Sequence, residues 1–407
     1  MNYPLGRIRL CTISALIFAK KLEQITEQLE KQFLSLYNKR PSIFRSPGRV
    51  NIIGEHTDYN QGFVLPAAID KAAYIAVSKR DDNEIHLYAN QFSEHFTTSI
   101  DNIPSPRGAW SDYLLGVLVQ LLERNYKPGG FDLVIEGDVP AGAGLSSSAA
   151  VECAMVCAMN HLFDLAIDKE HWALIAQKAE NQYVGVQCGI MDQFASVFGK
   201  PDHVFRLDCR SLDYEYFPFN LEGYKLLLLN SNVKHSLAST EYNVRRQQCE
   251  KAVEWLQETY PEVHSLRDAS LAMLGETVKP KDPLIYQRAR FIVEENNRVL
   301  RACDHLRDGD LAALGSEMYR SHYGLSREYE VSCKELDVLV ELAKPNSSVL
   351  GARMMGGGFG GCTINLVKEE AIGGLISQIK EPYESRTGLP LTYYIVSIGD
   401  GTEILQS

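Results

Sequence analysis

The stretch Arg45-Ser-Pro-Gly-Arg-Val-Asn-Ile-Ile-Gly-Glu-His-Thr-Asp-Tyr-Asn-Gln-Gly62 combines charged side chains, glycines and apolar residues within a short length of chain. Glycines let the backbone turn sharply, and Val50, Ile52 and Ile53 are apolar enough to enter a core. A surface hairpin with incidental charges is the alternative interpretation, but it needs no such combination. We therefore predict that the segment fixes charged groups around a small polar molecule. These groups are Arg49, Glu55, His56 and Asp58.

The composition describes a globular protein whose ligand is small. The chain has 407 residues, of which 45% are hydrophobic and 23% charged, enough for large cores and for two domains. Its net charge of −11 and the absence of a Lys/Arg run argue against a nucleic-acid or anionic-membrane partner. No segment approaches the roughly 18 apolar residues that span a membrane. We expect a small neutral or locally neutralised ligand.

The cysteines and the first residues indicate a cytoplasmic protein. The nine cysteines lack paired C-x-x-C spacing, which argues against a zinc ribbon and a disulfide framework. Cys153 and Cys157 lie one helical turn apart among apolar neighbours, which favours core packing over metal binding. Residues 7–19 imitate a signal peptide, but Thr and Ser interrupt the apolar run and no small-x-small cleavage site follows. We predict a reducing, cytoplasmic setting.

The hydrophobic pattern predicts a mixed α/β chain. Residues 16–38 read as a helix, amphipathic from residue 22 to 37, and residues 146–163 as a helix that is apolar on nearly all sides. Four short runs between them are strand-like. Their residues are 43–53, 72–78, 85–88 and 131–136.

A glycine-rich turn precedes the apolar helix: Gly137-Asp-Val-Pro-Ala-Gly-Ala-Gly-Leu-Ser-Ser-Ser148. Free backbone N–H groups and the positive end of the helix dipole suit a phosphate, and a serine hydroxyl suits Mg²⁺. The turn lacks the lysine of G-x-x-x-x-G-K-[ST] and is no Rossmann G-x-G-x-x-G, so those two nucleotide folds are disfavoured. A plain loop capped by serines is the alternative.

An acidic residue in the middle of the chain is a candidate for chemistry. Asp192 lies in a Gly-Ile-Met-Asp-Gln context after a predicted helix that ends near Tyr183. Beside Arg49 its carboxylate would stay ionised, and it could orient or deprotonate a hydroxyl that attacks a γ-phosphate. The residues alone do not bring Asp192 to Arg49, and a surface or capping aspartate is the alternative.

A second glycine cluster, Gly356-Gly-Gly-Phe-Gly-Gly361, lies before a strand-like run. Such glycine density suits a tight turn that closes over or supports a phosphate-bearing site. A bare hairpin turn needs fewer glycines, and a flexible linker would be flanked by Ser, Pro or charged residues.

Together these motifs resemble the galactokinase branch of the GHMP small-molecule kinases. Residues 48–60 look like the branch's sugar signature, Gly144-Leu-Ser-Ser-Ser-Ala149 like the family's phosphate loop, and residues 356–361 like its third motif. The resemblance spans most of the chain. Its further landmarks are residues 110–113, 188–194, 235–246 and 321–322.

The resemblance implies an α/β (α+β) two-domain GHMP kinase fold, with a ribosomal-protein-S5-like N-terminal domain, a mixed-sheet C-terminal domain and the active site between them. We place an N-terminal extension at residues 1–20, the N-terminal domain at 21–210 and the C-terminal domain at 211–407.

The resemblance also implies ATP-dependent phosphorylation of D-galactose at its C1 hydroxyl, a step of the Leloir pathway of galactose catabolism. Another sugar of the branch, such as N-acetylgalactosamine, galacturonate or arabinose, is one alternative. A non-catalytic sugar sensor is another, although some such relatives lack a Ser-Ala pair that is present here as Ser148-Ala149. ATP and Mg²⁺ are the expected co-substrate and metal, and we expect a monomer without nucleic-acid or membrane partners.

Carried over by motif position, the family's site residues fall into four groups. Arg49 and Asp192 are the expected catalytic pair. The expected sugar contacts are Glu55, His56, Asp58, Gly189, Asp192 and Tyr242. The expected ATP-binding residues are Trp110, Gly142, Ala143, Gly144, Leu145, Ser146, Ser147 and Ser148. The expected metal ligands are Ser148 and Glu180.

Overall fold

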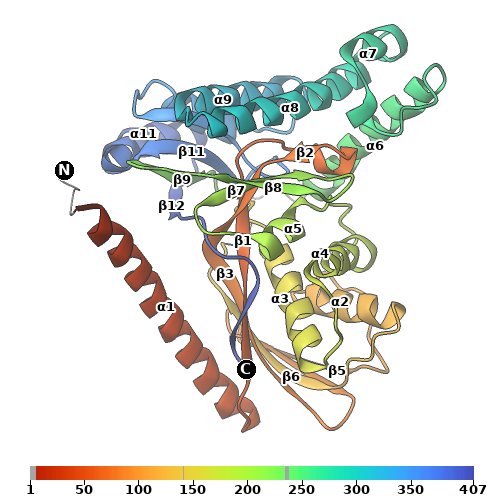
Figure 1. Ribbon diagram of the computed structural model, residues 1–407, viewed down its shortest axis with the longest axis vertical. Helices are drawn as coiled ribbons and strands as arrows, with labels where there is room; N and C mark the ends of the chain where they lie inside the picture. Colours follow the sequence, from red (N-terminus) through yellow and green to blue (C-terminus); the bar gives the residue numbers. More distant parts are fainter. Residues whose placement is uncertain (1–5, 141, 234–237) are drawn as a thin grey trace.

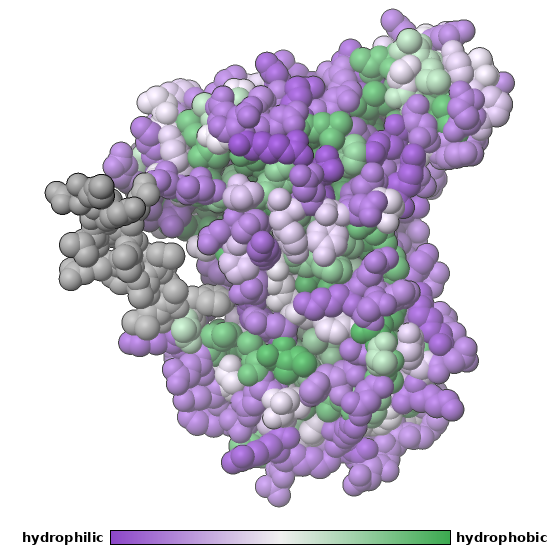
Figure 2. Space-filling model, in the orientation of Figure 1, coloured by the Kyte–Doolittle hydropathy of each residue, from purple (hydrophilic) through white to green (hydrophobic). Residues whose placement is uncertain are grey.

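The computed structural model describes residues 6–140, 142–233 and 238–407 (Figure 1). The lower part in that view holds a large sheet with α1 on one side and the helices α2 to α5 on the other. The upper part holds a smaller sheet beneath the long helices α8 and α9. Figure 2 shows the same face, which is hollowed on the right between these two parts.

The large sheet is mixed and six-stranded. Strands β4 and β6 run parallel, and the other neighbours run antiparallel. Side chains alternate between its two faces, so that Phe44 and Ile75 pack toward α3 while Ile43 and Tyr74 pack toward α1. In spatial order the strands are β13 (Glu403–Gln406), β1 (Ser42–Asn51), β3 (Pro66–Lys79), β6 (Phe131–Gly137), β4 (Glu84–Ala89) and β5 (Glu94–Ser99).

Helix α1 (Gly6–Tyr37) covers one face of this sheet. Leu29 and Phe33, one turn apart, are fully buried against Ala76 and Val134, as the amphipathic pattern requires. The predicted helix is confirmed, and within the described residues it begins at Gly6. Position 20 therefore lies inside a continuous helix.

The opposite face is covered by helices that pack around α3. The predicted apolar helix is confirmed as α3, whose alanines let neighbouring helices approach on several sides. All four strand-like runs are likewise confirmed, in β1, β3, β4 and β6. The helices on this face are α2 (Ser111–Glu123), α3 (Ser147–Leu162), α4 (Lys169–Lys178) and α5 (Met191–Phe198), with a π-helical turn at Ala179–Val184 between the last two.

The second sheet is antiparallel, and apolar side chains fill both of its faces. Leu226 and Leu228 pack toward α8 and α9, whereas Leu227 and Leu229 pack toward α10 and α11. In spatial order the strands are β10 (Val349–Met354), β11 (Cys362–Lys368), β9 (Tyr224–Asn230) and β12 (Thr392–Val396).

Helix α9 and strand β10 make a close contact that depends on two glycines. A Cβ on Gly315 would lie 2.1 Å from the Leu350 carbonyl oxygen, and one on Gly351 would lie 2.5 Å from Gly315 Cα. The helices of this half are α6 (Ala238–Gln257), α7 (Leu271–Thr277), α8 (Pro283–Arg307), α9 (Leu311–Arg327), α10 (Lys334–Ala343) and α11 (Ile372–Thr387). Short 3-10 turns lie at Asp58–Asn60, Leu266–Asp268 and Glu369–Ala371.

Two features join the halves. A third sheet, β2 (Phe63–Val64), β7 (His203–Asp208) and β8 (Tyr214–Pro218), lies at their junction, so position 210 falls between two paired strands. Strand β13 returns to the large sheet and pairs with β1, Glu403 opposite Arg45. None of the helices in the described ranges has the length and apolarity needed to cross a membrane.

Candidate active site

The charged signature segment leaves β1 and folds into a buried loop. Gly54 has a φ of 102°, a conformation that favours glycine, and its N–H donates to Glu295 Oε1 at 3.0 Å. Glu55 Oε1 accepts hydrogen bonds from Arg353 Nη2 and from the Gly356 N–H, both at 2.9 Å. Arg353 is fully buried and also donates to the Ile52 carbonyl at 2.7 Å. The loop is therefore fixed by groups from the other half of the chain.

Arg49 and Asp192 form a bidentate ion pair. Arg49 Nε lies 2.8 Å from Asp192 Oδ1, and Nη2 lies 2.9 Å from Oδ2. The remaining nitrogen, Nη1, donates to the Gly144 carbonyl in the glycine-rich turn. Burial opposes the charge on Arg49, but the carboxylates of Asp192, Glu55 and Asp58 outweigh it and raise the pKa of Arg49. Planar two-point pairing fixes the carboxylate in orientation as well as in position.

Asp192 lies in the first turn of α5, where the helix dipole favours a negative charge. Ser146 Oγ donates a third hydrogen bond to Asp192, at Oδ2. On the other side of the turn, a Cβ on Gly48 would lie 2.6 Å from the Leu145 carbonyl oxygen, so the strand and the turn meet only because residue 48 is glycine. The turn is thus packed directly onto the ion pair.

The glycine-rich turn ends at α3 with an open helix N-terminus. Ser146 has a φ of 56°, and no side chain of the described residues caps the helix there. Its first N–H groups therefore remain available to an anion. The second glycine cluster packs on the same turn, since a Cβ on Gly361 would meet Ala143 at 3.3 Å and one on Gly356 would meet the Gly144 carbonyl at 3.4 Å. The second glycine cluster thus forms the predicted tight turn and supports the glycine-rich turn before α3.

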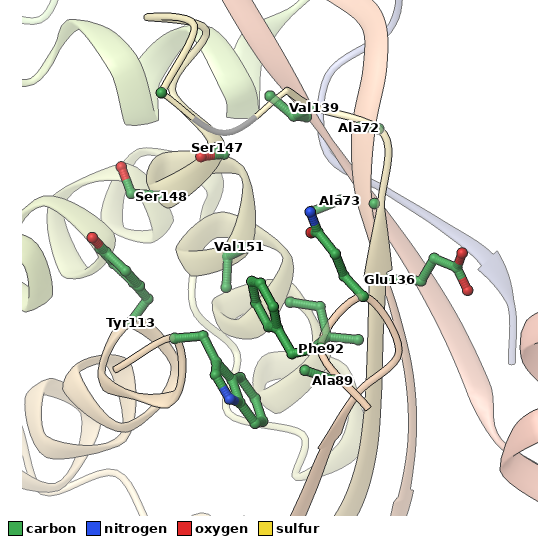
Figure 3. Close-up of a pocket in the computed structure, with 15 residues that line it drawn as sticks. Ala72, Ala73, Ala89, Phe92, Tyr113, Glu136, Val139, Ser147, Ser148 and Val151 are labelled. Atoms are coloured by element: carbon green, nitrogen blue, oxygen red, sulfur yellow. The ribbon is translucent and has the colours of Figure 1, made fainter. Parts of the chain in front are cut away.

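A cavity of about 350 Å³ opens beside this helix N-terminus, and we call it the aromatic cavity. Figure 3 shows Ser147 and Ser148 at one end, with the Phe92 ring and Val151 farther along it. Trp110 and Tyr113 from the start of α2 complete the wall. The cavity therefore pairs a hydroxyl-lined end with a flat, apolar end. Its other lining residues include Ala72, Ala73, Ala89, Gln91, Ile135, Glu136, Gly137, Val139 and Gly142.

A second cavity, also of about 350 Å³, lies on the other side of the turn, and we call it the carboxylate cavity. Gly142 lines both cavities, so they meet at the glycine-rich turn. The Arg49–Asp192 pair lines the second one near this junction. Its other polar lining residues are Glu55, His56, Asp58, Glu180 and Tyr242.

Asp58 and Gly189 are in contact at the edge of the carboxylate cavity. A Cβ on Gly189 would lie 2.0 Å from Asp58 Oδ2, so only glycine leaves room for the carboxylate. Burial, and then the negative charge of Asp192, raise the pKa of Asp58 to about 7. Gly189 itself lines a neighbouring cavity of about 330 Å³ that shares Asp58 and Cys188 with the carboxylate cavity.

His56 is held in a cluster of tyrosines. Its ring centroid lies 5.3 Å from that of Tyr242 and 5.0 Å from that of Tyr329, and its Nδ1 lies 2.8 Å from Tyr59 Oη. Burial lowers the pKa of His56 to about 3, so the imidazole is neutral at neutral pH. Its buried Nε2 makes no hydrogen bond of good geometry in the described part of the chain, although the Gly357 backbone partly offsets the effect of burial on this pKa.

Ser148 and Glu180 meet between the two cavities. Ser148 Oγ donates to Glu180 Oε1 at 3.1 Å, and the π-helical turn that carries Glu180 is a form often found at functional sites. Gln193 Nε2 bridges Glu180 Oε2 at 2.7 Å and Glu152 Oε2 at 3.2 Å. Burial and Asp192 raise the pKa of Glu180 to about 7, because the cluster holds more negative than positive groups.

This arrangement fits a magnesium ion that arrives with phosphates. Mg²⁺ is usually bound through one or two carboxylates together with substrate phosphate oxygens. Ser148 offers one hydroxyl and Glu180 one carboxylate. Among the described residues, no cluster of three or more His, Cys, Asp or Glu forms a closed metal cage. Glu152 lies nearby, and its buried Oε1 has no hydrogen-bond partner in the described residues; burial, and then the charge of Glu180, raise the pKa of Glu152 well above its usual range.

Comparisons with known proteins agree with this geometry. Residues 31–79 match the galactokinase galactose-binding signature, and residues 112–200 and 300–385 match the GHMP kinases N terminal domain and the GHMP kinases C terminal region. A galactokinase of Roseiflexus sp. (strain RS-1) is 40% identical over 377 residues, which cover 92% of this chain and 96% of that protein. The chain belongs to the galactokinase family.

Solved structures agree with the family. The crystal structure of Lactococcus lactis galactokinase complexed with galactose matches with a TM-score of 0.90 and 35% identity, over 94% of this chain and all of that one. A mevalonate kinase from Methanococcus jannaschii, at 17% identity and a TM-score of 0.62 over 88% and 99% of the two chains, shares the fold. The predicted galactokinase branch, GHMP fold and kinase activity are confirmed.

Most of the residues expected from the family line one of the two cavities. Ala143 and Leu145 do not, because their side chains are buried in the core beneath the turn. The Ser146 side chain is engaged by Asp192. Gly189 shapes the site indirectly through Asp58.

Several residues that brace this galactokinase site were not selected from the sequence. Arg353 lies three residues before the second glycine cluster, yet its role depends on contacts with residues about 300 positions away. Glu152 is a lone acid on the apolar helix α3, and this contrast was a usable signal. Glu295 and Tyr329 carried no local signal in the sequence.

Proposed function

We propose that the protein is an ATP:D-galactose 1-phosphotransferase that forms galactose 1-phosphate and ADP. The observation that carries the proposal is the bidentate Arg49–Asp192 pair at the junction of two cavities of matching size. One cavity suits a sugar and the other a nucleotide, and the phosphate-binding turn separates them. Family membership and the galactose complex of the Lactococcus lactis relative support the choice of sugar.

The carboxylate cavity is the proposed sugar site. A sugar hydroxyl needs fixed donors and acceptors, and an epimer that leaves buried polar groups unpaired is penalised. Glu55 and Asp58 supply carboxylate oxygens from a braced loop, while His56 and Tyr242 supply ring and hydroxyl groups. Gly189 would keep the Asp58 carboxylate in place from behind.

The aromatic cavity is the proposed ATP site. Trp110, Tyr113 and Phe92 offer flat apolar surface for a purine. The phosphates would lie over the open N-terminus of α3, where Ser147, Ser148 and the turn backbone from Gly142 to Ser146 supply N–H and hydroxyl donors.

In the proposed reaction, the C1 oxygen of galactose attacks the γ-phosphorus, the bond from phosphorus to the β–γ bridging oxygen breaks, and ADP leaves. The C1 hydroxyl loses its proton toward Asp192, which either accepts it or orients the hydroxyl while the proton passes to the transferred phosphate. Arg49 fixes the Asp192 carboxylate through two hydrogen bonds and places positive charge next to the developing negative charge.

Ser148 and Glu180 would hold the magnesium ion of the nucleotide. Bound there, the ion would neutralise charge on the β- and γ-phosphates. Ser148 lines the aromatic cavity and Glu180 the carboxylate cavity, so the two ligands would join the two substrates.

We further propose that the protein acts as a monomer in the cytoplasm, with the domain boundary near residue 210. The free thiols of the cysteines from Cys153 to Cys362 support a reducing compartment. Sedimentation tests the monomeric state, and cell fractionation tests the compartment.

The first test is an ADP-release assay with ATP, Mg²⁺ and either galactose, glucose, N-acetylgalactosamine, galacturonate or arabinose at equal concentration. We expect galactose to give the largest turnover, with the product phosphate on C1 as located by phosphorus NMR. A preference for another sugar would replace the substrate, and sugar binding without turnover would indicate a sensor.

A further inference from the structure

A chain of hydrogen-bonding groups lies behind His56, on the side away from the carboxylate cavity. It runs from His56 Nδ1 to Tyr59 Oη at 2.8 Å, on to Tyr329 Oη at 2.8 Å, and ends at Cys249 Sγ at 3.2 Å. Tyr329 and Cys249 are almost completely buried. Each of these four groups has one hydrogen to donate, so the hydrogen bonds can run in either direction along the series.

The members come from three separate parts of the fold. His56 and Tyr59 belong to the signature loop, Tyr329 follows α9, and Cys249 lies on α6. Arg245, one turn before Cys249, donates to the Tyr329 carbonyl through Nε at 2.9 Å and so anchors the segment that carries Tyr329. The Tyr329 ring also packs on Phe291, with centroids 5.0 Å apart. The chain is therefore rigid at its far end.

Acid–base strength selects one direction. The neutral imidazole nitrogen is the strongest base in the chain and a phenol hydroxyl is a better donor than a second imidazole N–H, so the Tyr59 hydroxyl donates to His56 Nδ1. Tyr59 Oη then accepts from the Tyr329 hydroxyl, and Tyr329 Oη accepts from the Cys249 thiol. In this direction the hydroxyl and thiol hydrogens of Tyr59, Tyr329 and Cys249 each have an acceptor, and the ring's only hydrogen resides on Nε2.

The other face of the imidazole belongs to the carboxylate cavity, which His56 lines. Nε2 is buried and makes no hydrogen bond of good geometry in the described residues, although the Gly357 backbone, which also lines this cavity, raises the pKa of the ring as a hydrogen-bond acceptor does. Such an atom costs free energy until a ligand satisfies it. An Nε2–H can only donate, so its partner must be an acceptor such as a sugar hydroxyl oxygen.

We propose that Tyr59 and Tyr329 are positioning residues that hold His56 as its Nε2–H tautomer, so that His56 donates a hydrogen bond to one hydroxyl oxygen of the sugar. This inference rests on the proposed sugar site. It assigns part of the sugar specificity to two tyrosines, of which Tyr329 lies some 270 residues from the signature.

The first arm of the test is nitrogen NMR of the sugar-free protein, in which a protonated ring nitrogen is distinguished from an unprotonated one. His56 is assigned by its loss in His56→Gln. We expect a protonated Nε2 in the wild type and a mixture of tautomers in Tyr59→Phe. A protonated Nδ1 in the wild type would overturn the proposal.

The second arm is kinetic. We expect Tyr59→Phe to lower kcat/KM for galactose about three- to tenfold, mostly through KM, with a smaller loss in Tyr329→Phe and no change in the KM for ATP. In a His56→Ala background, Tyr59→Phe should cause no further loss, whereas a purely structural role would add to it. Tyr260→Phe, which removes a hydroxyl bonded to Glu276 at 2.7 Å, is the matched control.

Monodeoxy galactoses identify the hydroxyl concerned. For one deoxy analogue, kcat/KM should be lower than for galactose in the wild type. This difference should disappear in His56→Ala and become smaller in Tyr59→Phe. If the wild type phosphorylates galactose and the loss of kcat/KM for each deoxy analogue is the same in the wild type and in Tyr59→Phe, this inference alone is overturned. A wild type inactive on galactose would instead overturn the proposed function, and the NMR result would still decide the tautomer.

Discussion

The two cavities that meet at Gly142 are equal in volume but differ in the kinds of side chain that line them. The carboxylate cavity is lined by charged side chains, and Glu55 and Asp192 each accept hydrogen bonds from at least two groups. The aromatic cavity is lined mainly by apolar and aromatic surface. Fixed polar groups select a ligand by the pattern of its hydroxyls, whereas flat apolar walls select mainly by shape. Selectivity should therefore be strict for the ligand of the carboxylate cavity and looser for the ligand of the aromatic cavity.

The largest effect is expected from the charge at the junction. Asp192→Asn keeps the shape of the side chain but removes the negative charge that Arg49 holds, so kcat should fall about 10²- to 10⁴-fold. The ADP-release assay measures this, with circular dichroism as the test of folding. Asp81→Asn, at an exposed position, is the matched control. Turnover of Asp192→Asn near that of the wild type would refute the role of the pair.

The next effect concerns the residue between the cavities. Glu180→Gln should raise the Mg²⁺ concentration for half-maximal turnover about 10- to 100-fold, because an amide is a poorer ligand than a carboxylate. Galactose binding without ATP, measured by calorimetry, should be unchanged. Glu170→Gln on exposed surface is the control. An unaltered Mg²⁺ requirement would remove Glu180 from the metal site.

A smaller effect is expected on the strict side alone. Gly189→Ala would place a methyl group 2.0 Å from Asp58 Oδ2 and displace that carboxylate. We expect the KM for galactose to rise about tenfold or more, as for the loss of one charge-assisted hydrogen bond, while the KM for ATP stays constant. Gly275→Ala has open space around the new methyl group and serves as control. Equal changes in both KM values would indicate general disruption instead.

The smallest effect is expected on the looser side. Trp110→Leu keeps an apolar wall and removes the aromatic face, so the KM for ATP should rise about two- to tenfold. The KM for galactose should not respond. Trp255→Leu on α6 is the matched control. A fall in kcat in Trp110→Leu as large as that in Asp192→Asn would contradict the contrast between the cavities.

The sequence predicted the parts of the site that lie within continuous motifs. Residues 49–58, the serines before α3 and the second glycine cluster each carry a local reason for their composition, such as a turn or a helix N-terminus. The family resemblance then brought Arg49 and Asp192 together, which spacing alone did not.

The braces between motifs could not be predicted in the same way. Arg353 reaches the carbonyls of the signature strand, and Glu295 reaches the Gly54 N–H from α8, through contacts set by how helices and sheets pack. The Ser146 hydroxyl points to Asp192 because its backbone has a positive φ, which the sequence does not reveal. Long-range side-chain partners follow from the fold and leave no pattern in neighbouring residues.

The return of β13 to the edge of β1 has a consequence for how the protein is made. The ribosome extends chains by about 5–20 residues per second, so roughly 20 to 70 s pass between synthesis of Asn51 and of Glu403. During that interval the strand that carries Arg49 has an unpaired edge, which is a template for wrong pairing with another nascent chain. The edge of the strand that carries Arg49 is therefore open to wrong pairing for most of the time that the chain takes to be made.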